Sequence, residues 1–480
     1  MRRLGKRAHS CERGEQPELL FDVAALLITS AALGPAAEAS IAHENTAIIL
    51  TLAASPQSAL PPLRPVDRTI TGLAGYGTLT EPASAGNSVP ISTFAVTTVT
   101  NAELATLSGE PFLQALSAFP QDRIASFVSS HPSAVSRFLT SPPTAVEVSN
   151  VWNSIDAAQQ DALVASAPRL VANLDGVPTA VRDRAGRAWM TASIQSLTAD
   201  VQTVSGRALA EDAQHQLHML GEVQSALNTP NGQPARSLLS VDPTGQGKAA
   251  IVVGDLATAD YVTYIVPGMF FKVDGQIDDW ANDASDLYTL QTKWLDRIGG
   301  PNAHKTVAVV AWMGYQTPDL TNIGSLDLAY QGRDALARAV EGMQVDRAGN
   351  EPYTTIVAHS YGSTAALMAL TEYDFSVDAL ALVGSPGSAA QSVRDLHVRN
   401  ANVWVGAAAW DPVPNSAWFG SDPSSPSYGA KSMSVAGETD PITGESLAPS
   451  FGHNEYFGHG TESMRNMALI GIDEGALVDR

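Results

Sequence analysis

The 480-residue chain contains a single cysteine, Cys11. A disulfide needs two thiols and a cysteine-based metal site needs several, so neither a disulfide framework nor such a site can be built. The sequence also lacks an uninterrupted apolar run of the roughly 20 residues that a membrane-spanning helix requires. We therefore expect no stable transmembrane segment.

Positive charge is scarce. The chain has 28 lysines and arginines against 49 aspartates and glutamates, which gives a formal net charge of −21. A phosphate backbone would be repelled by such a surface, so we exclude a nucleic-acid partner. Charged residues make up 16% of the chain and hydrophobic residues 44%, which is typical of a globular protein. At this length we expect a large core and more than one folded unit.

Residues 1–45 have two interpretations. Basic residues near the start precede an apolar stretch (23–33) and a segment of small residues (35–40), which is the order found in a secretory signal. Acidic residues between residues 15 and 22 are unusual for a signal. The segment is thus either a signal, which would make the protein secreted or envelope-bound, or a tail followed by a helix in a cytoplasmic protein.

The rest of the chain divides into three parts. Residues 46–98 are rich in proline, serine and alanine without periodicity, which predicts a linker. Residues 99–235 carry apolar side chains at helical spacing, as at Leu104 and Leu107, and predict a helical region. In residues 236–480 short apolar runs alternate with helical patterns. We predict an α/β domain there, with a mostly parallel sheet covered by helices on both faces.

Within this domain the expected strands set the geometry. Ala249–Val253 and Tyr261–Val266 are separated by a short segment and are expected to pair as a hairpin. Ligands of parallel sheets bind at the carboxyl ends of the strands, so residues that directly follow a strand are the first candidates for a site. Further strands are expected at 307–312, 353–357, 379–383, 403–407 and 431–435.

Ser360 is the candidate nucleophile. It lies in Ala-His-Ser-Tyr-Gly, between a β-branched run and a stretch of small apolar residues that reads as a buried helix. A strand that turns sharply into a helix through a serine followed two residues later by glycine is the nucleophile elbow of α/β-hydrolases. Gly362 leaves room for close packing, and Ala358 replaces the more usual first glycine.

A serine hydroxyl needs a base, and the base needs an orienting acid. Asp411 follows the expected strand 403–407 and is our candidate acid, although an aspartate before proline is also common in plain turns. Two histidines follow the last strand. His453 is our candidate base, because His459 stands just before an expected helix and is better explained as a surface residue.

The remaining candidates concern substrate binding. A developing oxyanion needs two N–H donors, which we assign to the backbones of Tyr361, directly after the nucleophile, and Met269, after the strand that ends in Pro-Gly. Phe270 and Tyr315 are candidates for the substrate pocket, although phenylalanines are often plain core residues and turn chemistry also explains the segment around Tyr315.

Several of these segments resemble a largely actinobacterial α/β-hydrolase family that is catalogued as a domain of unknown function. The likeness extends from about residue 151 to 471 and departs from the family at Ala358, where glycine is usual. It implies a Ser-Asp-His hydrolase fold without a cofactor. The segments that carry it are Asn173–Pro178, Arg182–Arg184, Ile265–Met269, Ala311–Tyr315, Val357–Ser363, Asp411–Pro414 and His453 with Tyr456-Phe457.

We therefore predict a serine hydrolase that cleaves small-molecule carboxylic esters or acyl compounds through an acyl-enzyme, in the manner of an esterase or lipase, without cofactor or metal. Two alternatives stay open. The same triad cleaves amides, which allows a peptidase or amidase. A hydrolase-like scaffold that only binds is the alternative outside the enzymes.

Overall fold

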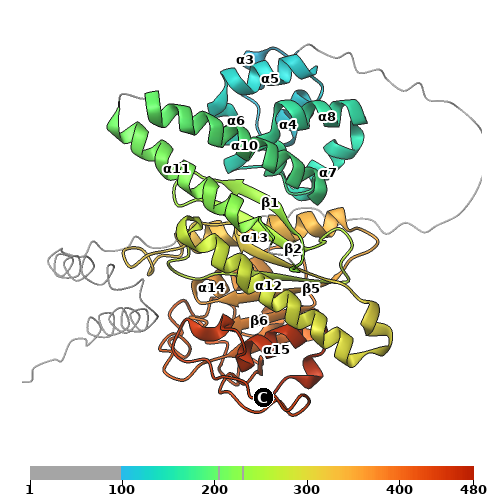
Figure 1. Cartoon of the computed structure of the whole chain (residues 1–480), viewed down its shortest axis with the longest axis vertical. Helices are drawn as coiled ribbons and strands as arrows, with labels where there is room; N and C mark the ends of the chain where they lie inside the picture. The colour runs from blue at the N-terminus through green and yellow to red at the C-terminus, as the bar shows by residue number, and fades with distance from the viewer. Residues whose placement is uncertain (1–98, 204–205, 230–231, 480) are drawn as a thin grey trace, which may run out of the picture. The chain divides into compact units, whose positions relative to one another are not determined.

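The computed structural model describes residues 99–203, 206–229 and 232–479 (Figure 1). The predicted signal or tail (1–45) and the whole of the predicted linker (46–98) lie outside the described residues. Residues 101–479 form one compact unit. No helix among the residues described combines the length and the apolar character needed to cross a bilayer.

The first part of this unit is helical. Two of its helices begin with a capping box, in which Thr144 pairs with Glu147 and Asp156 with Gln159. In the three helices that span residues 109–140, the Phe112 ring packs against those of Phe127 and Phe138. The helices are α3 (Asn101–Leu104), α4 (Gly109–Ser117), α5 (Gln121–Ser130), α6 (Pro132–Thr140), α7 (Ala145–Ser154), α8 (Ala157–Ser166), α9 (Pro168–Ala172), α10 (Thr179–Thr203) and α11 (Arg207–Ala226).

The second part is built on an eight-stranded sheet in the order β1-β2-β4-β3-β5-β6-β7-β8. Its strands are parallel from β4 to β8, while β2 runs antiparallel to both β1 and β4. The strands are β1 (Arg236–Asp242), β2 (Lys248–Gly254), β3 (Tyr261–Val266), β4 (Val307–Met313), β5 (Tyr353–His359), β6 (Ala379–Val383), β7 (Val403–Gly406) and β8 (Lys431–Ser432). The prediction of a mostly parallel sheet flanked by helices is confirmed.

The predicted hairpin between residues 249–253 and 261–266 is wrong. The β2 strand forms its hairpin with β1, through a turn containing Gly245 and Gly247, both of which have positive φ. The β3 strand lies instead between β4 and β5 and is parallel to both. A short connection thus joins β2 and β3, but the two strands do not pair. Both faces of β3 are apolar and need to be covered by helices, and that happens in the middle of the sheet.

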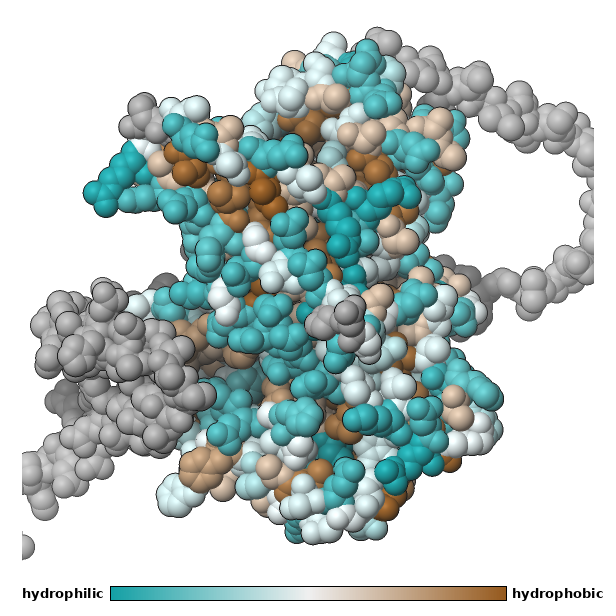
Figure 2. Space-filling model, in the orientation of Figure 1, coloured by the Kyte–Doolittle hydropathy of each residue, from teal (hydrophilic) through white to brown (hydrophobic). Residues whose placement is uncertain are grey.

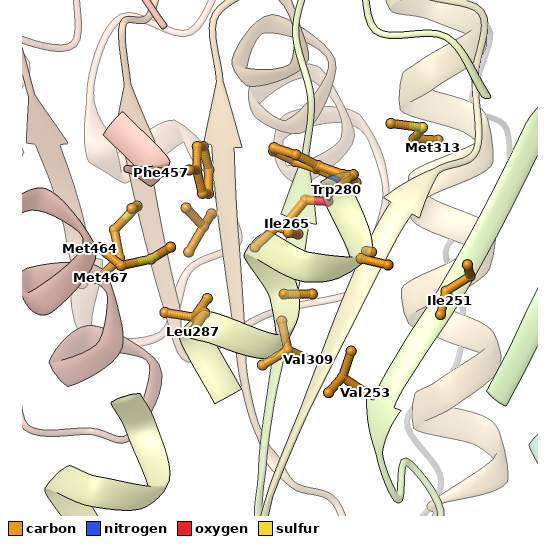
Figure 3. Close-up of a cluster of buried hydrophobic side chains, with 14 of the residues drawn as sticks. Ile251, Val253, Ile265, Trp280, Leu287, Val309, Met313, Phe457, Met464 and Met467 are labelled. Atoms are coloured by element: carbon orange, nitrogen blue, oxygen red, sulfur yellow. Dashed lines mark hydrogen bonds between the residues drawn. The ribbon is translucent and has the colours of Figure 1, made fainter. Parts of the chain in front are cut away.

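Helices cover the two faces of the sheet. On one face, α12 (Val273–Ile298) and α15 (Glu462–Gly471) pack with α11 on side chains such as Ile265 and Val309. Figure 3 shows this core, with Trp280 and Leu287 of α12 facing the sheet and Met464 and Met467 of α15 beside them. On the other face lie α13 (Asp327–Asp346) and α14 (Tyr361–Glu372). The molecular surface seen in Figure 2 is mostly hydrophilic and carries scattered apolar patches.

The helical region is joined to the outer edge of β1. Asp183 of α10 accepts a hydrogen bond from the Leu238 N–H at 2.6 Å, and Asn173 accepts one from the Val241 N–H at 3.0 Å. Arg187 donates to the Arg236 carbonyl at 2.9 Å. An uncovered edge strand offers a row of unpaired polar groups to other chains. The helical region therefore satisfies and shields the edge of the sheet.

Candidate active site

Ser360 lies in a strained turn between β5 and α14. Its φ of 53° and ψ of −131° fall in a region that residues with a side chain rarely occupy. Its N–H is held by the Val383 carbonyl of the neighbouring strand at 3.0 Å. A Cβ on Gly362 would lie 2.3 Å from the Pro267 carbonyl oxygen, so only glycine fits at this place. The turn is thus the sharp strand-to-helix corner that presents a serine side chain at the carboxyl edge of a sheet.

His453 connects Ser360 with Asp411. Its Nε2 lies 2.7 Å from the Ser360 Oγ, and its Nδ1 lies 2.9 and 3.0 Å from the two carboxylate oxygens of Asp411. The imidazole is 5% exposed and the Asp411 side chain 0% exposed. With Asp411 accepting from the Nδ1–H, the Nε2 is left free to accept the serine proton. Three residues that are far apart in the sequence therefore form one hydrogen-bonded chain.

Two loops bring the acid and the base together. The loop after β7 carries Asp411, and it runs beside the loop that carries His453 through a parallel bridge between Ala409 and Phe451. The Gly452 N–H donates to the Ala409 carbonyl at 2.9 Å. By contrast, His459 is exposed and lies outside this arrangement.

Asp411 is held by more than His453. Its Oδ1 accepts the Val413 N–H at 2.9 Å, and its Oδ2 accepts the Tyr456 hydroxyl. The Tyr456 oxygen in turn accepts the Ala408 N–H at 2.9 Å. Burial, with the Asp411 charge as the next cause, raises the pKa of Tyr456 well above its ordinary value, so the hydroxyl remains a donor. The Tyr456 hydroxyl thus holds one oxygen of the Asp411 carboxylate and the Val413 N–H holds the other.

Neither Tyr456 nor His359 was assigned to the site from the sequence. His359 is 4% exposed, and its Nε2 lies 2.7 Å from the carbonyl oxygen of His453. The signals for both residues were present in the sequence, namely a histidine in the elbow and a tyrosine three residues after His453. Their partners are distant in the chain, so the contacts themselves were not visible.

The two expected oxyanion donors belong to segments that adjoin Ser360. The Tyr361 N–H is the first of α14, a position without an intrahelical acceptor. Gly268 packs directly on Ser360, since a Cβ on Gly268 would lie 2.4 Å from the Ser360 Cβ, and Met269 follows it in the chain. The Phe270 N–H donates to the Pro318 carbonyl at 3.0 Å, which fixes the segment beyond Met269.

The two pocket candidates have different surroundings. Phe270 is half-buried and has a φ of 67°. Tyr315 is 2% exposed, stacks on Trp312, and donates its hydroxyl to the Pro267 carbonyl at 2.8 Å. The Tyr315 hydroxyl therefore holds the backbone just before Gly268 in place. We retain only Phe270 as a candidate for contact with substrate.

In the part of the chain that the structure describes, no group of three or more histidine, cysteine, aspartate or glutamate side chains is arranged to hold a metal ion. His215 and His218 both lie near Asp274, at 3.7 and 2.8 Å respectively, and are about half exposed. They join α11 to the start of α12.

Comparison with known proteins agrees with this architecture. Residues 242–421 match the model of a family described as alpha/beta hydrolase, a range that includes Ser360 and Asp411 and ends before His453. An uncharacterized protein of Mycobacterium tuberculosis is 29% identical over 379 residues, which cover 69% of this chain and 56% of that protein. An uncharacterized protein of Mycobacterium bovis is 27% identical over 238 residues, covering 48% of this chain and 85% of its own length. The chain thus spans little more than half the length of the first relative.

Solved structures that resemble the chain include two esterases. Carboxyl esterase 2 of the fungus Tuber melanosporum has a TM-score of 0.32 and 13% identity, and the match covers 53% of this chain and 90% of that one. An esterase of Pyrobaculum calidifontis has the same TM-score and identity, with 59% and 98% covered. The sheet, the helices on its two faces and the family match over residues 242–421 show that the domain following the helical region has the α/β-hydrolase fold, which confirms the fold predicted from the sequence.

Proposed function

We propose that the protein is a serine hydrolase that cleaves carboxylic esters through an acyl-enzyme intermediate. The observation that carries this proposal is the distance of 2.7 Å between the Ser360 Oγ and the His453 Nε2, with the Asp411 carboxylate on the other ring nitrogen. This geometry allows His453 to accept the serine proton while Asp411 stabilises the imidazolium that forms.

The reaction then has two halves. In the first, the Ser360 oxygen attacks the acyl carbon, its proton passes to His453, and His453 returns that proton to the leaving alcohol. In the second, His453 takes a proton from water, the resulting hydroxide attacks the acyl-enzyme, and Ser360 regains its proton as the acid leaves. The backbone N–H groups of Met269 and Tyr361 stabilise the oxyanion in both halves. Removing one such donor typically raises the activation free energy by about 2.7–4 kcal/mol.

The strained backbone of Ser360 supports an enzyme over a binding scaffold. A non-glycine residue in this region of φ and ψ costs on the order of 1–3 kcal/mol, and such strain persists where the geometry serves a function. A scaffold that only binds has no use for a serine held in this conformation against a buried imidazole. Peptidase or amidase action rests on the same residues, so the substrate panel must contain amides as well as esters.

Two histidine variants test the proposal. We expect His453→Ala to lower kcat for p-nitrophenyl esters by at least about 10²-fold, because proton transfer by a positioned base typically contributes 10²–10⁴-fold. His459→Ala is the matched control, since this exposed residue follows His453 by six positions in the same segment, and it should retain most of the activity. Loss of activity in His459→Ala with retention in His453→Ala would overturn the assignment.

A further inference from the structure

His359 contacts the backbone of the candidate base, His453. It is the last residue of β5 and is bonded directly to Ser360, while its ring lies 4.7 Å from that of His453, measured between centroids. A carbonyl oxygen can only accept a hydrogen bond, so the 2.7 Å contact requires a proton on the His359 Nε2. A single side chain thus links the strand that carries the nucleophile to the backbone of the base.

The surroundings keep this donor uncharged. His453, Asp411 and Tyr456 are the titratable side chains that face His359, and burial, followed by the nearby His453, lowers the pKa of His359 to about 3. When Ser360 attacks, His453 becomes an imidazolium. A second positive ring at this distance would oppose that charge, whereas a neutral imidazole supplies the N–H without opposing it.

We infer that His359 is a positioning residue for the base: its Nε2–H donates to the His453 carbonyl and holds the imidazole in register with both Ser360 and Asp411. This inference rests on the proposed function and adds a residue to it. An alternative is that His359 only fills space, since its ring also lies near those of Tyr456 and Phe457. The two explanations differ in whether the N–H donor matters.

Glutamine and methionine separate them, because their side chains are of similar length and only glutamine carries an N–H donor. We expect His359→Gln to retain most of the wild-type kcat for a p-nitrophenyl ester. His359→Met should lose about 10²-fold in kcat with KM nearly unchanged, because small misplacement of a catalytic group costs this much. In His359→Met the rate of fluorophosphonate labelling of Ser360 should fall together with kcat.

The pH dependence adds a measurement that space filling alone would not affect. If His453 drifts from Asp411, its imidazolium loses stabilisation, so the acid limb of kcat/KM should move to lower pH in His359→Met and stay in place in His359→Gln. Thermal unfolding of each variant shows whether it is folded. Equal kcat values and equal acid limbs in the two variants, with an active wild type, would overturn the inference alone. A folded wild type that neither hydrolyses esters or amides nor reacts with the fluorophosphonate would overturn the proposed function and this inference with it.

Discussion

Gly268 packs so closely on Ser360 that a methyl group on Gly268 would lie 2.4 Å from the Ser360 Cβ and 3.0 Å from its Oγ. Both atoms belong to Ser360, whose backbone is held in the strained turn, so the serine cannot move aside at low energetic cost. We predict that Gly268→Ala displaces the Met269 N–H and the nucleophile together and lowers kcat for esters by at least about 10²-fold, the cost of losing one oxyanion donor.

Gly221→Ala is the control for this substitution. Gly221 lies within α11, and a Cβ there would meet nothing within 4 Å. Alanine is favoured over glycine in a helix by up to about 1 kcal/mol, so this variant should keep its activity and unfold at the same or a higher temperature. Full ester hydrolysis by Gly268→Ala would show that the Met269 N–H is not an oxyanion donor.

Tyr456→Phe should weaken the support of Asp411. The change removes the hydroxyl that donates to the carboxylate and leaves the buried Ala408 N–H without its acceptor. We expect a loss of about 1–3 kcal/mol in the free energy of unfolding and a decrease in kcat of about tenfold, measured by denaturant titration and ester hydrolysis.

Tyr428→Phe provides the comparison. The Tyr428 hydroxyl is buried and has no hydrogen-bond partner among the residues described, so its removal should leave both quantities unchanged or raise stability slightly. If the two tyrosine variants behaved alike, the contact between Tyr456 and Asp411 would have no energetic importance.

Asp183→Ala should expose the edge of the sheet. The Leu238 N–H would lose its acceptor and Arg187 its ion-pair partner. We predict a loss of about 1–3 kcal/mol in the free energy of unfolding and a greater tendency to self-associate through β1, followed by light scattering. Asp200→Ala, an exposed position on the same helix, should change neither property.

Asp283→Asn should change how stability depends on pH. Burial, with the Asp286 and Asp279 carboxylates as further causes, raises the pKa of Asp283 to about 7 from an ordinary value of 3.8. Between these values the folded state binds more protons than the unfolded state, so this group stabilises the protein as the pH falls from 7 towards 4. The variant should be more stable than wild type at pH 8, and the difference should vanish near pH 4. Asp279→Asn, an exposed neighbour, should show a smaller effect.

The mostly parallel sheet and the positions of Ser360, Asp411 and His453 followed from the sequence for one physical reason. Parallel strands end at the same edge of a sheet, so residues that directly follow different strands meet there whatever their separation in the chain. The strand order around β2 and β3 did not follow, because pairing depends on which neighbours bury both faces of a strand. Short spacing between two strands does not decide that.

Hydrogen bonds between side chains and backbone groups also could not be predicted from the sequence. His359 and Tyr456 act on carbonyl and N–H groups of His453 and Ala408, and backbone groups are the same at every position, so no residue pattern marks them as partners. For the same reason Tyr315 was expected in the pocket, whereas its hydroxyl binds the Pro267 carbonyl.

Covalent labelling tests the central claim most directly. Wild-type protein treated with a fluorophosphonate should gain the mass of one adduct, and peptide mapping should place it on Ser360. Ser360→Ala should show no adduct, and His453→Ala should react at least about 10²-fold more slowly, because the serine has lost its base. Folded wild-type protein that stays unlabelled, or that is labelled at a residue other than Ser360, would contradict the account.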